Sequence, residues 1–177
     1  MNIYQLFRPR SILDFTMGWG GRYIGACALN IPHYIGIDMN HELKGAYKEM
    51  KEFTRSCGST TQSKFIFKNA LMVDYSQYEY DCVLTSPPYY NIETYRGMKT
   101  WTTKEAWNRE FYVPLFTKTM RFLSKGGWYC LNISEEIYEV CIPLWGKATK
   151  KIPLTISTRE KSKKNRYKEY IYCWNKF

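Results

Sequence analysis

Histidines are few in this 177-residue chain, and its cysteines are unpaired in sequence. It has two histidines and six scattered cysteines with no C-x-x-C pair, so we expect neither a metal site nor a disulfide framework. Free thiols are typical of a reducing compartment, which predicts an intracellular location. The sequence also lacks an apolar run of membrane-spanning length and a secretory signal peptide, so we expect no membrane association and no secretion.

Internal repeats and low-complexity linkers are missing too, which favours one domain over residues 1–177. Short apolar runs alternate with helical patterns along the chain, and this alternation predicts a parallel sheet with helices on both faces. We expect strands near 11–15, 33–38, 64–68, 80–85, 127–133, 153–158 and 168–175. We expect helices near 21–30, 41–56, 103–123 and, more weakly, 135–141, with long irregular loops at 86–102 and 134–153. The last two strands predict an antiparallel hairpin.

A rigid polar motif follows the buried strand expected at 80–85. The motif is Ser86-Pro87-Pro88-Tyr89. Because both prolines fix φ and lack an N–H, the strand stops abruptly with unpaired carbonyls. Ser86 offers a hydroxyl and Tyr89 an aromatic face at the sheet edge where ligands bind in doubly wound folds. Together they suit a planar base that carries an exocyclic amino group.

A glycine-rich turn at 16–21 follows the first predicted strand. Gly18 and Gly20 allow a tight turn and a close approach of the backbone to a ligand at a helix N-terminus. The second strand ends in Asp38, about 20 residues past the glycines, where an acid is positioned to accept a hydrogen bond from a ribose hydroxyl. Either feature alone is a weak signal, but the ordered set is a strong one.

These motifs resemble the class I, S-adenosylmethionine-dependent methyltransferases that methylate amino groups in DNA, at cytosine N4 or adenine N6. Residues 14–21 are similar to the cofactor loop of that group, Ile37-Asp38 to its ribose-binding strand end, and residues 86–89 to its catalytic tetrapeptide. The motifs as they stand here are most similar to those of small phage and large-virus members. The resemblance covers about residues 11–133 and is specific for cofactor and chemistry, less so for the target sequence.

The resemblance implies a single-domain Rossmann-like methyltransferase with a mostly parallel mixed sheet and no separate target-recognition domain. It implies S-adenosylmethionine as cofactor and a cytoplasmic or host-cell intracellular location. The residues implied for catalysis are Ser86, Pro87, Pro88 and Tyr89. Those implied for cofactor binding are Asp14, Thr16, Gly18, Gly20, Asp38, Asn69 and Ala70.

The expected chemistry is methyl transfer to an exocyclic amino nitrogen of a flipped base. Ser86 Oγ and the Pro87 carbonyl would accept the two N–H groups, and the Tyr89 ring would stack on the base. Only the ring is invoked, so we expect Tyr89→Phe to be nearly silent. Serine in the first motif position slightly favours cytosine N4. Methylation at cytosine C5 needs a Pro-Cys dipeptide, and no proline here precedes a cysteine.

Positive charge is concentrated near the end of the chain. Residues 147–177 hold ten Lys and Arg against two Glu, a net charge of +8 out of +10 for the whole chain. A basic loop beside a base-binding motif predicts contacts with nucleic-acid phosphates. The expected nucleic-acid contacts are Tyr90, Tyr95, Arg96, Lys99, Lys161, Lys163, Lys164 and Arg166.

Departures from the family pattern leave alternatives open. There is little room before Ser11 for an N-terminal helix, and Asn69 stands where an acid usually meets the adenine ring. The partner is expected to be DNA, with RNA amino methylation as one alternative and a non-catalytic binding subunit as another. A homodimer or a partner subunit would supply the target recognition that the chain lacks.

Overall fold

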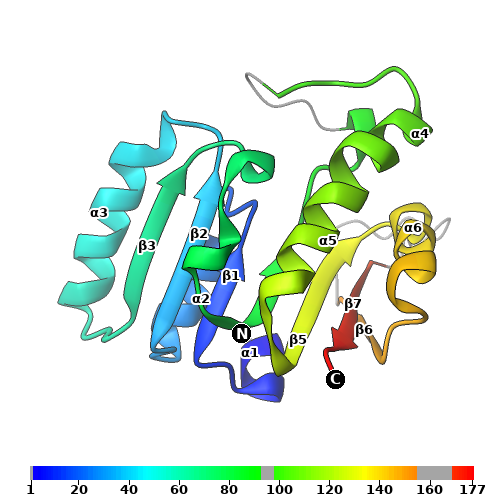
Figure 1. Cartoon of the computed structure of the whole chain (residues 1–177). Coiled ribbons are helices and arrows are strands. Elements are labelled where there is room, and N and C mark those ends of the chain that lie inside the picture. The colour runs from blue at the N-terminus through cyan, green and yellow to red at the C-terminus, as the bar shows by residue number, and fades with distance from the viewer. Residues whose placement is uncertain (1, 93–97, 155–168) are drawn as a thin grey trace, which may run out of the picture.

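The computed structural model of this protein describes residues 2–92, 98–154 and 169–177, which form helices around a seven-stranded sheet (Figure 1). The strands are β1 (Ser11–Asp14), β2 (His33–Asp38), β3 (Gln62–Phe67), β4 (Tyr80–Thr85), β5 (Leu123–Ile133), β6 (Lys150–Pro153) and β7 (Tyr170–Asn175). The α-helices are α1 (Asn2–Phe7), α2 (Gly21–Ala28), α3 (Leu43–Ser56), α4 (Lys104–Trp107), α5 (Val113–Phe122) and α6 (Glu135–Trp145). Shorter turns are η1 (Ala70–Met72), η2 (Tyr75–Gln77), η3 (Tyr90–Ile92) and the π-helical η4 (Asn108–Tyr112).

The strand order is β3-β2-β1-β4-β5-β7-β6. Strands β1 to β5 are parallel, whereas β7 runs antiparallel to both β5 and β6. This arrangement confirms the predicted fold class, including the antiparallel hairpin at the end of the chain. The hairpin loop expected to carry the basic residues lies within 155–168, outside the described residues.

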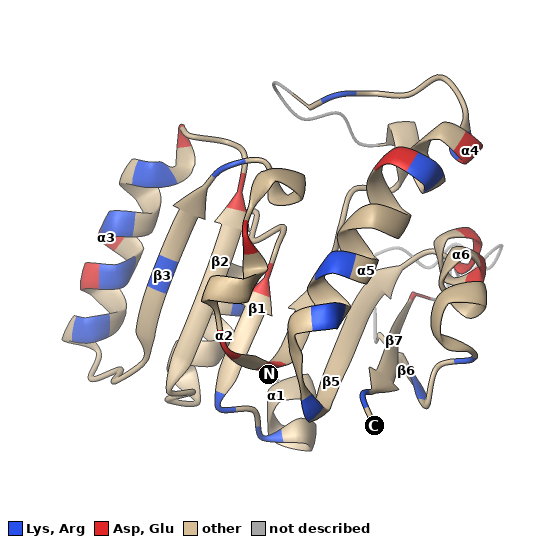
Figure 2. Cartoon of the chain, in the orientation of Figure 1, with Lys and Arg blue, Asp and Glu red and all other residues tan. Residues whose placement is uncertain are grey.

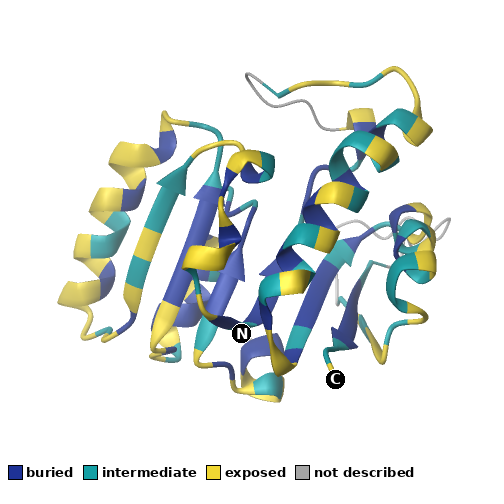
Figure 3. Cartoon of the chain, in the orientation of Figure 1, coloured by how far each residue is buried: buried dark blue, intermediate teal, exposed yellow. Residues whose placement is uncertain are grey.

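The sheet separates two hydrophobic cores. Adjacent residues of a strand face opposite sides, and accordingly Ile12 belongs to one core and Leu13 to the other. The first core also contains side chains of α1, α2 and α3, and the second contains side chains of η2, α5 and α6. Figure 3 shows the resulting buried central strands between partly exposed helices. Helices therefore cover both faces, as predicted.

Two predictions about irregular segments are wrong. A six-residue helix, α1, does fit before β1, and its Tyr4 hydroxyl donates to the Arg22 carbonyl at 3.2 Å. Most of the loop expected at 134–153 is helix α6, which confirms the weaker expectation of a helix at 135–141 and extends it to Trp145. Ser134 caps its N-terminus by accepting from the Ile137 amide at 3.4 Å. Pro143 lies in its last turn, where the missing N–H disturbs few bonds of the helix.

The helix expected at 103–123 is present but interrupted by the π-helical turn η4. Such a turn inserts an extra residue into a helix and often marks a functional site. Here the turn ends at Tyr112, a fully buried side chain that reaches the segment after β4.

No helix among residues 2–92, 98–154 and 169–177 is long and apolar enough to cross a membrane.

Candidate active site

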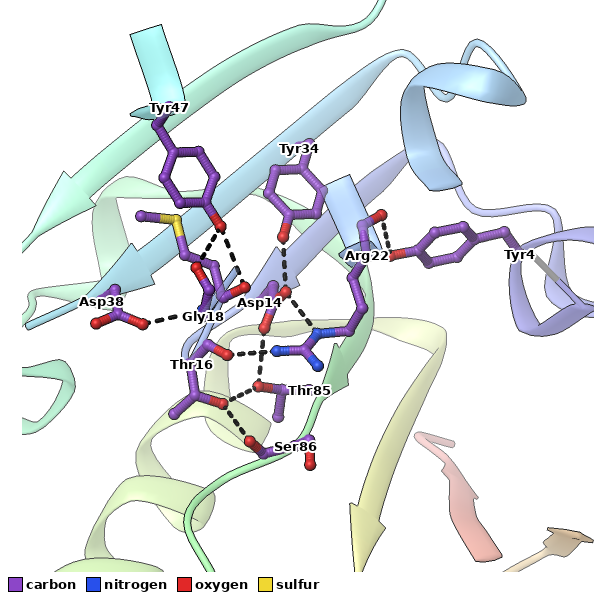
Figure 4. Close-up of polar contacts among 11 residues, drawn as sticks. Tyr4, Asp14, Thr16, Gly18, Arg22, Tyr34, Asp38, Tyr47, Thr85 and Ser86 are labelled. Carbon is purple, nitrogen blue, oxygen red and sulfur yellow. Dashed lines mark hydrogen bonds and ion pairs between the residues drawn. The ribbon is translucent and has the colours of Figure 1, made fainter. Parts of the chain in front are cut away.

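The candidate site lies at the carboxyl edge of the sheet, where the loops after β1 and β4 lie side by side. Strand β1 is between β2 and β4, so the chain leaves β1 towards one side of the sheet and reaches β4 on the other. In doubly wound folds, ligands bind at such a switch point. Figure 4 shows the polar contacts that gather there, and Figure 2 shows acidic residues at the ends of β1 and β2.

The glycine loop, residues 16–20, has a backbone that only glycine adopts easily at two positions. Gly18 has φ of +53° and Gly20 of +86°, and Gly20 caps the N-terminus of α2. The Tyr47 hydroxyl lies 3.1 Å from the Met17 carbonyl and 3.0 Å from the Gly18 carbonyl, and it donates to them. Burial raises the pKa of Tyr47, so this hydroxyl remains a donor. Tyr47 thus supports the loop backbone at Met17 and Gly18.

Asp38 connects this loop to the end of β2. Its carboxylate accepts from the Gly18 amide and from the Asn40 amide, each at 2.9 Å. A carboxylate has about four acceptor positions, so two remain after these contacts. The half-buried position of Asp38 leaves them accessible to hydroxyl groups of a ligand.

Asn69 and Ala70 follow β3 at the same edge. Asn69 is exposed, and its Oδ1 accepts from the Leu71 amide at 3.0 Å, which begins the turn η1. The amide oxygen can accept a second hydrogen bond, so its expected contact with a base ring is compatible with this capping role. Ala70, the next residue, is buried.

The Asp14 carboxylate makes its hydrogen bonds within the protein. Asp14 is fully buried, and its carboxylate accepts from Arg22 Nε at 2.7 Å, Tyr34 at 2.6 Å and Thr85 at 2.9 Å. Burial opposes the charge of Arg22, but the Asp14 carboxylate more than offsets this and raises the Arg22 pKa. Arg22 also donates to the Thr16 carbonyl. Asp14 therefore supports the glycine loop through Arg22, which contacts both the Asp14 carboxylate and the Thr16 carbonyl.

The backbone of the tetrapeptide 86–89 is fixed from two sides. Thr16 Oγ1 lies 3.0 Å from the Ser86 carbonyl oxygen, to which it can donate. On the other side the Tyr112 hydroxyl donates to the Pro88 carbonyl at 2.6 Å and accepts from the Tyr90 amide at 2.9 Å. Tyr90 has φ of +50°, a strained value for a large side chain that this bond helps to maintain.

Two oxygen acceptors of the tetrapeptide make no hydrogen bond to the described residues. Within the described parts of the chain, neither Ser86 Oγ nor the Pro87 carbonyl has a hydrogen-bond partner, although the carbonyls on both sides of Pro87 have one. Ser86 is half-buried at the sheet edge. The site thus presents two oxygen acceptors on a backbone that cannot easily move.

The Tyr89 side chain is hydrogen-bonded to Asn132, a residue that was not predicted from the sequence. Its hydroxyl donates to Asn132 Oδ1, near the end of β5, at 3.0 Å. The expectation that only the ring matters is therefore incomplete. Asn132 is the polar residue in the otherwise apolar run 127–133 of β5, a signal that could have identified it. Nothing in the sequence distinguishes Tyr112 from other buried aromatics.

The expected nucleic-acid contacts divide into three groups. Tyr90 is 6% exposed and packs edge-on against Trp107 and Tyr112, so its ring belongs to the core. Lys99 is exposed and pairs with Glu110 at 2.8 Å. The others lie outside the described residues: Tyr95, Arg96, Lys161, Lys163, Lys164 and Arg166.

The Lys99–Glu110 pair belongs to a small surface network. Glu110 also accepts from Trp101 Nε1 at 2.6 Å, and the Lys99 ammonium lies 5.1 Å from the centre of the Trp101 ring. Hydrogen bonds from Lys99 and Trp101 lower the pKa of Glu110 to about 2. Lys99 therefore has an intramolecular partner and would have to exchange it to contact a phosphate.

Two basic residues near the end of the chain are also engaged within the protein. Lys151 pairs with Glu135 at 3.2 Å and lies over the Tyr170 ring. Lys176 Nζ donates to three carbonyls near the end of α5, at 2.6–3.0 Å. These two charges therefore have partners within the protein.

Comparison with known proteins identifies the fold. No protein-family model matches the sequence, and no curated protein matches it either. TrmN from Thermus thermophilus is similar in structure, with a TM-score of 0.70 and 15% identity over 99% of this chain and 47% of TrmN. NSun6 from Pyrococcus horikoshii, solved with SFG, has a TM-score of 0.63 and 17% identity over 94% of this chain and 47% of NSun6.

An rRNA methylase from Streptococcus thermophilus has a TM-score of 0.58 and 12% identity, over 94% of this chain and 87% of that one. The present chain thus spans about half the length of TrmN and of NSun6. At these identities the likeness concerns the fold alone. The chain has the fold of the class I, S-adenosylmethionine-dependent methyltransferases.

Proposed function

We propose that this protein transfers a methyl group from S-adenosylmethionine to an exocyclic amino nitrogen of a base in nucleic acid. The observation that carries the proposal is the pair of free acceptors, Ser86 Oγ and the Pro87 carbonyl, on a fixed backbone at the switch point of the sheet. An amino group has two N–H donors, and the two acceptors match them in number.

The residues of the glycine loop and the neighbouring strand ends fit the cofactor. Gly18 and Gly20 offer open backbone at the start of α2, and Asp38 has unused acceptor positions for the ribose hydroxyls. Asn69 and Ala70 are assigned to the adenine ring, because they follow β3 at the same edge of the sheet. When bound, S-adenosylmethionine supplies a methyl group that its sulfonium sulfur already activates. Asp14 is assigned a supporting role, because its carboxylate is used within the protein.

Ser86 and Pro87 would prepare the amino nitrogen for attack. The lone pair of such a nitrogen is delocalised into the ring, which makes it a poor nucleophile. Hydrogen bonds from both N–H groups to fixed acceptors favour a tetrahedral nitrogen, and positioning of the reactants supplies much of the remaining rate enhancement. The proton leaves the nitrogen for water after the methyl group has transferred.

Tyr89 would hold the target base outside the stack. Chemistry on a base within a duplex requires that the base is flipped out. Stacking on an aromatic ring is worth roughly 1–3 kcal/mol per base and offsets part of that cost. The bond from the Tyr89 hydroxyl to Asn132 fixes the ring before the base arrives.

The sequence motifs favour DNA as the substrate, with cytosine N4 slightly ahead of adenine N6. RNA is the second candidate, which the likeness to an rRNA methylase favours. Phosphate contacts are proposed for the basic residues between 155 and 168, and recognition of a target sequence for a second copy or a partner subunit. A non-catalytic role is the third candidate.

Product analysis distinguishes these candidates. The protein is incubated with S-adenosylmethionine carrying a labelled methyl group and with DNA or RNA, and the nucleosides are identified by mass spectrometry after digestion. We expect N4-methylcytosine or N6-methyladenine. Label at cytosine C5, or no transfer by a protein that binds the cofactor, contradicts the proposal.

A further inference from the structure

Thr16 is the point at which the glycine loop touches the tetrapeptide. Its hydroxyl lies 2.6 Å from Thr85 Oγ1 and 3.0 Å from the Ser86 carbonyl oxygen (Figure 4). Among the hydrogen bonds of the described residues, these two are the ones that join residues 16–20 to residues 85–90. The side chain therefore faces the tetrapeptide, although its sequence position suggests a cofactor contact.

Thr16 and Thr85 have one hydroxyl proton each, but their hydroxyl groups make three hydrogen-bond contacts. Asp14, the ion-pair partner of Arg22, accepts from Thr85, so the single proton of Thr85 is used there. The Thr16 proton can then be directed to Thr85 Oγ1 or to the Ser86 carbonyl, but it cannot fully satisfy both. The Thr16 hydroxyl thus has two alternative acceptors at hydrogen-bond distance.

The two alternatives differ in what they do to the tetrapeptide. When Thr16 donates to the Ser86 carbonyl, the loop and the tetrapeptide are tied together, next to the free Ser86 Oγ. When it donates to Thr85, this tie is broken, and the tetrapeptide depends on the contacts of Tyr112 and Asn132. Which acceptor takes the proton depends on the distance and angle from the Thr16 hydroxyl to each, and so on the position of the glycine loop.

The position of the loop depends on the group that would bind the cofactor ribose. Asp38 accepts from the Gly18 amide, two residues from Thr16, and the carbonyl of Thr16 itself accepts from Arg22. A ligand that recruits the Asp38 carboxylate therefore acts on the loop through Gly18. The Asp38 carboxylate is thus connected to the Ser86 carbonyl through the glycine loop and the Thr16 hydroxyl.

We propose that the Thr16 hydroxyl couples the two binding sites, so that the cofactor and the target base bind cooperatively. This inference rests on the proposed function, because it requires a cofactor at the glycine loop and a base at Ser86. Cofactor binding fixes the loop with the Thr16 proton on the Ser86 carbonyl, and the tetrapeptide is then held in the shape that receives the amino group. Thr16 is a positioning residue and contacts neither the methyl group nor the attacking nitrogen.

The test measures the coupling itself. The dissociation constant of S-adenosylhomocysteine is determined by titration calorimetry alone and with a saturating single-stranded oligonucleotide of all four bases, as DNA and as RNA. The ratio of the two constants is the coupling, and any effect of a substitution on cofactor affinity alone cancels in it. Linkage requires the same ratio for oligonucleotide affinity with and without S-adenosylhomocysteine, which checks the measurement.

We expect a ratio of about three to ten for the wild-type protein, the range of one neutral hydrogen bond. Thr16→Val keeps the shape of the side chain and removes the hydroxyl, so its ratio should fall to about one. Thr16→Ser keeps the hydroxyl and should retain the coupling. A thermal melt establishes that each variant is folded.

Two results would overturn the inference, namely a wild-type ratio of one or a Thr16→Val ratio equal to that of the wild type. The first needs no variant, so the inference stays testable even if Thr16→Val fails to fold. Failure of the proposed function looks different, since the wild-type protein would then not bind S-adenosylhomocysteine, or would bind neither oligonucleotide.

Discussion

The hydroxyl of Tyr89 donates to Oδ1 of Asn132 at 3.0 Å, and this bond joins the end of the tetrapeptide to strand β5. It fixes the ring that is proposed to stack on the target base. An aromatic ring whose position is set before the ligand arrives loses less conformational freedom on binding. The hydroxyl of Tyr89 should therefore contribute to activity through Asn132, without touching the substrate.

Tyr89→Phe should lower kcat/KM for the nucleic-acid substrate, by the equivalent of about 0.5–1.5 kcal/mol for one neutral hydrogen bond. Asn132→Ala should have a similar effect, and the double variant should be little worse than either single one because the two changes remove the same bond. Steady-state kinetics of the three variants give the coupling energy. Strictly additive effects would mean that the bond does not orient the ring.

Ser86→Ala should reduce turnover by about ten- to a hundred-fold, since a fixed acceptor near the reacting nitrogen contributes most in the transition state. Oligonucleotide affinity should change much less. Ser124→Ala, at the exposed second residue of β5, is the matched control and should leave both quantities unchanged. Full turnover by Ser86→Ala would assign the tetrapeptide a purely structural role.

Asp38→Ala should weaken S-adenosylmethionine binding by about 1.5–3 kcal/mol, because it removes the charged acceptor proposed for the ribose hydroxyls. It also removes the bond to the Gly18 amide, so Asp38→Asn, which retains one oxygen acceptor, should be intermediate. Calorimetric titration measures both, with the exposed Glu139→Ala as control. An unchanged affinity in Asp38→Ala would remove Asp38 from the cofactor site.

Tyr112→Phe should lower the free energy of unfolding by about 1–3 kcal/mol, because the buried Pro88 carbonyl and Tyr90 amide lose their common partner. Denaturant unfolding gives the value. Tyr78→Phe is the control, since within the described residues the Tyr78 hydroxyl makes no hydrogen bond. Equal stability of the two variants would show that Tyr112 does not hold the tetrapeptide.

Neutralising Lys161, Lys163, Lys164 and Arg166 together should weaken nucleic-acid binding about equally for all sequences. The slope of log affinity against log salt should flatten by about one for each phosphate that the variant no longer neutralises. Cofactor affinity serves as the internal control and should not change. A slope equal to that of the wild-type protein would make this segment an ordinary solvated surface.

The amino-acid sequence determined the elements of the fold and the order of its motifs. Apolar periodicity, the glycines at 18 and 20 and the two prolines act locally, so the strand ends that carry Asp38 and Ser86 could be located from neighbouring residues alone. The resemblance to a methyltransferase group then predicted the mostly parallel sheet with an antiparallel hairpin that the structure has. Helix α6 was predicted only weakly and too short, over 135–141, because Pro143 near its end weakens the helical pattern.

Only the tertiary structure decided which of these residues face a ligand and which support it. Asp14 and Tyr90 are sequence neighbours of site residues, yet their side chains are used inside the protein. Asn132 and Tyr112 reach the tetrapeptide from elements 43 and 24 residues further along the chain. Contacts over such separations depend on strand order and on the π-helical turn η4, because these set the direction of each side chain, and no local pattern in the sequence specifies that direction.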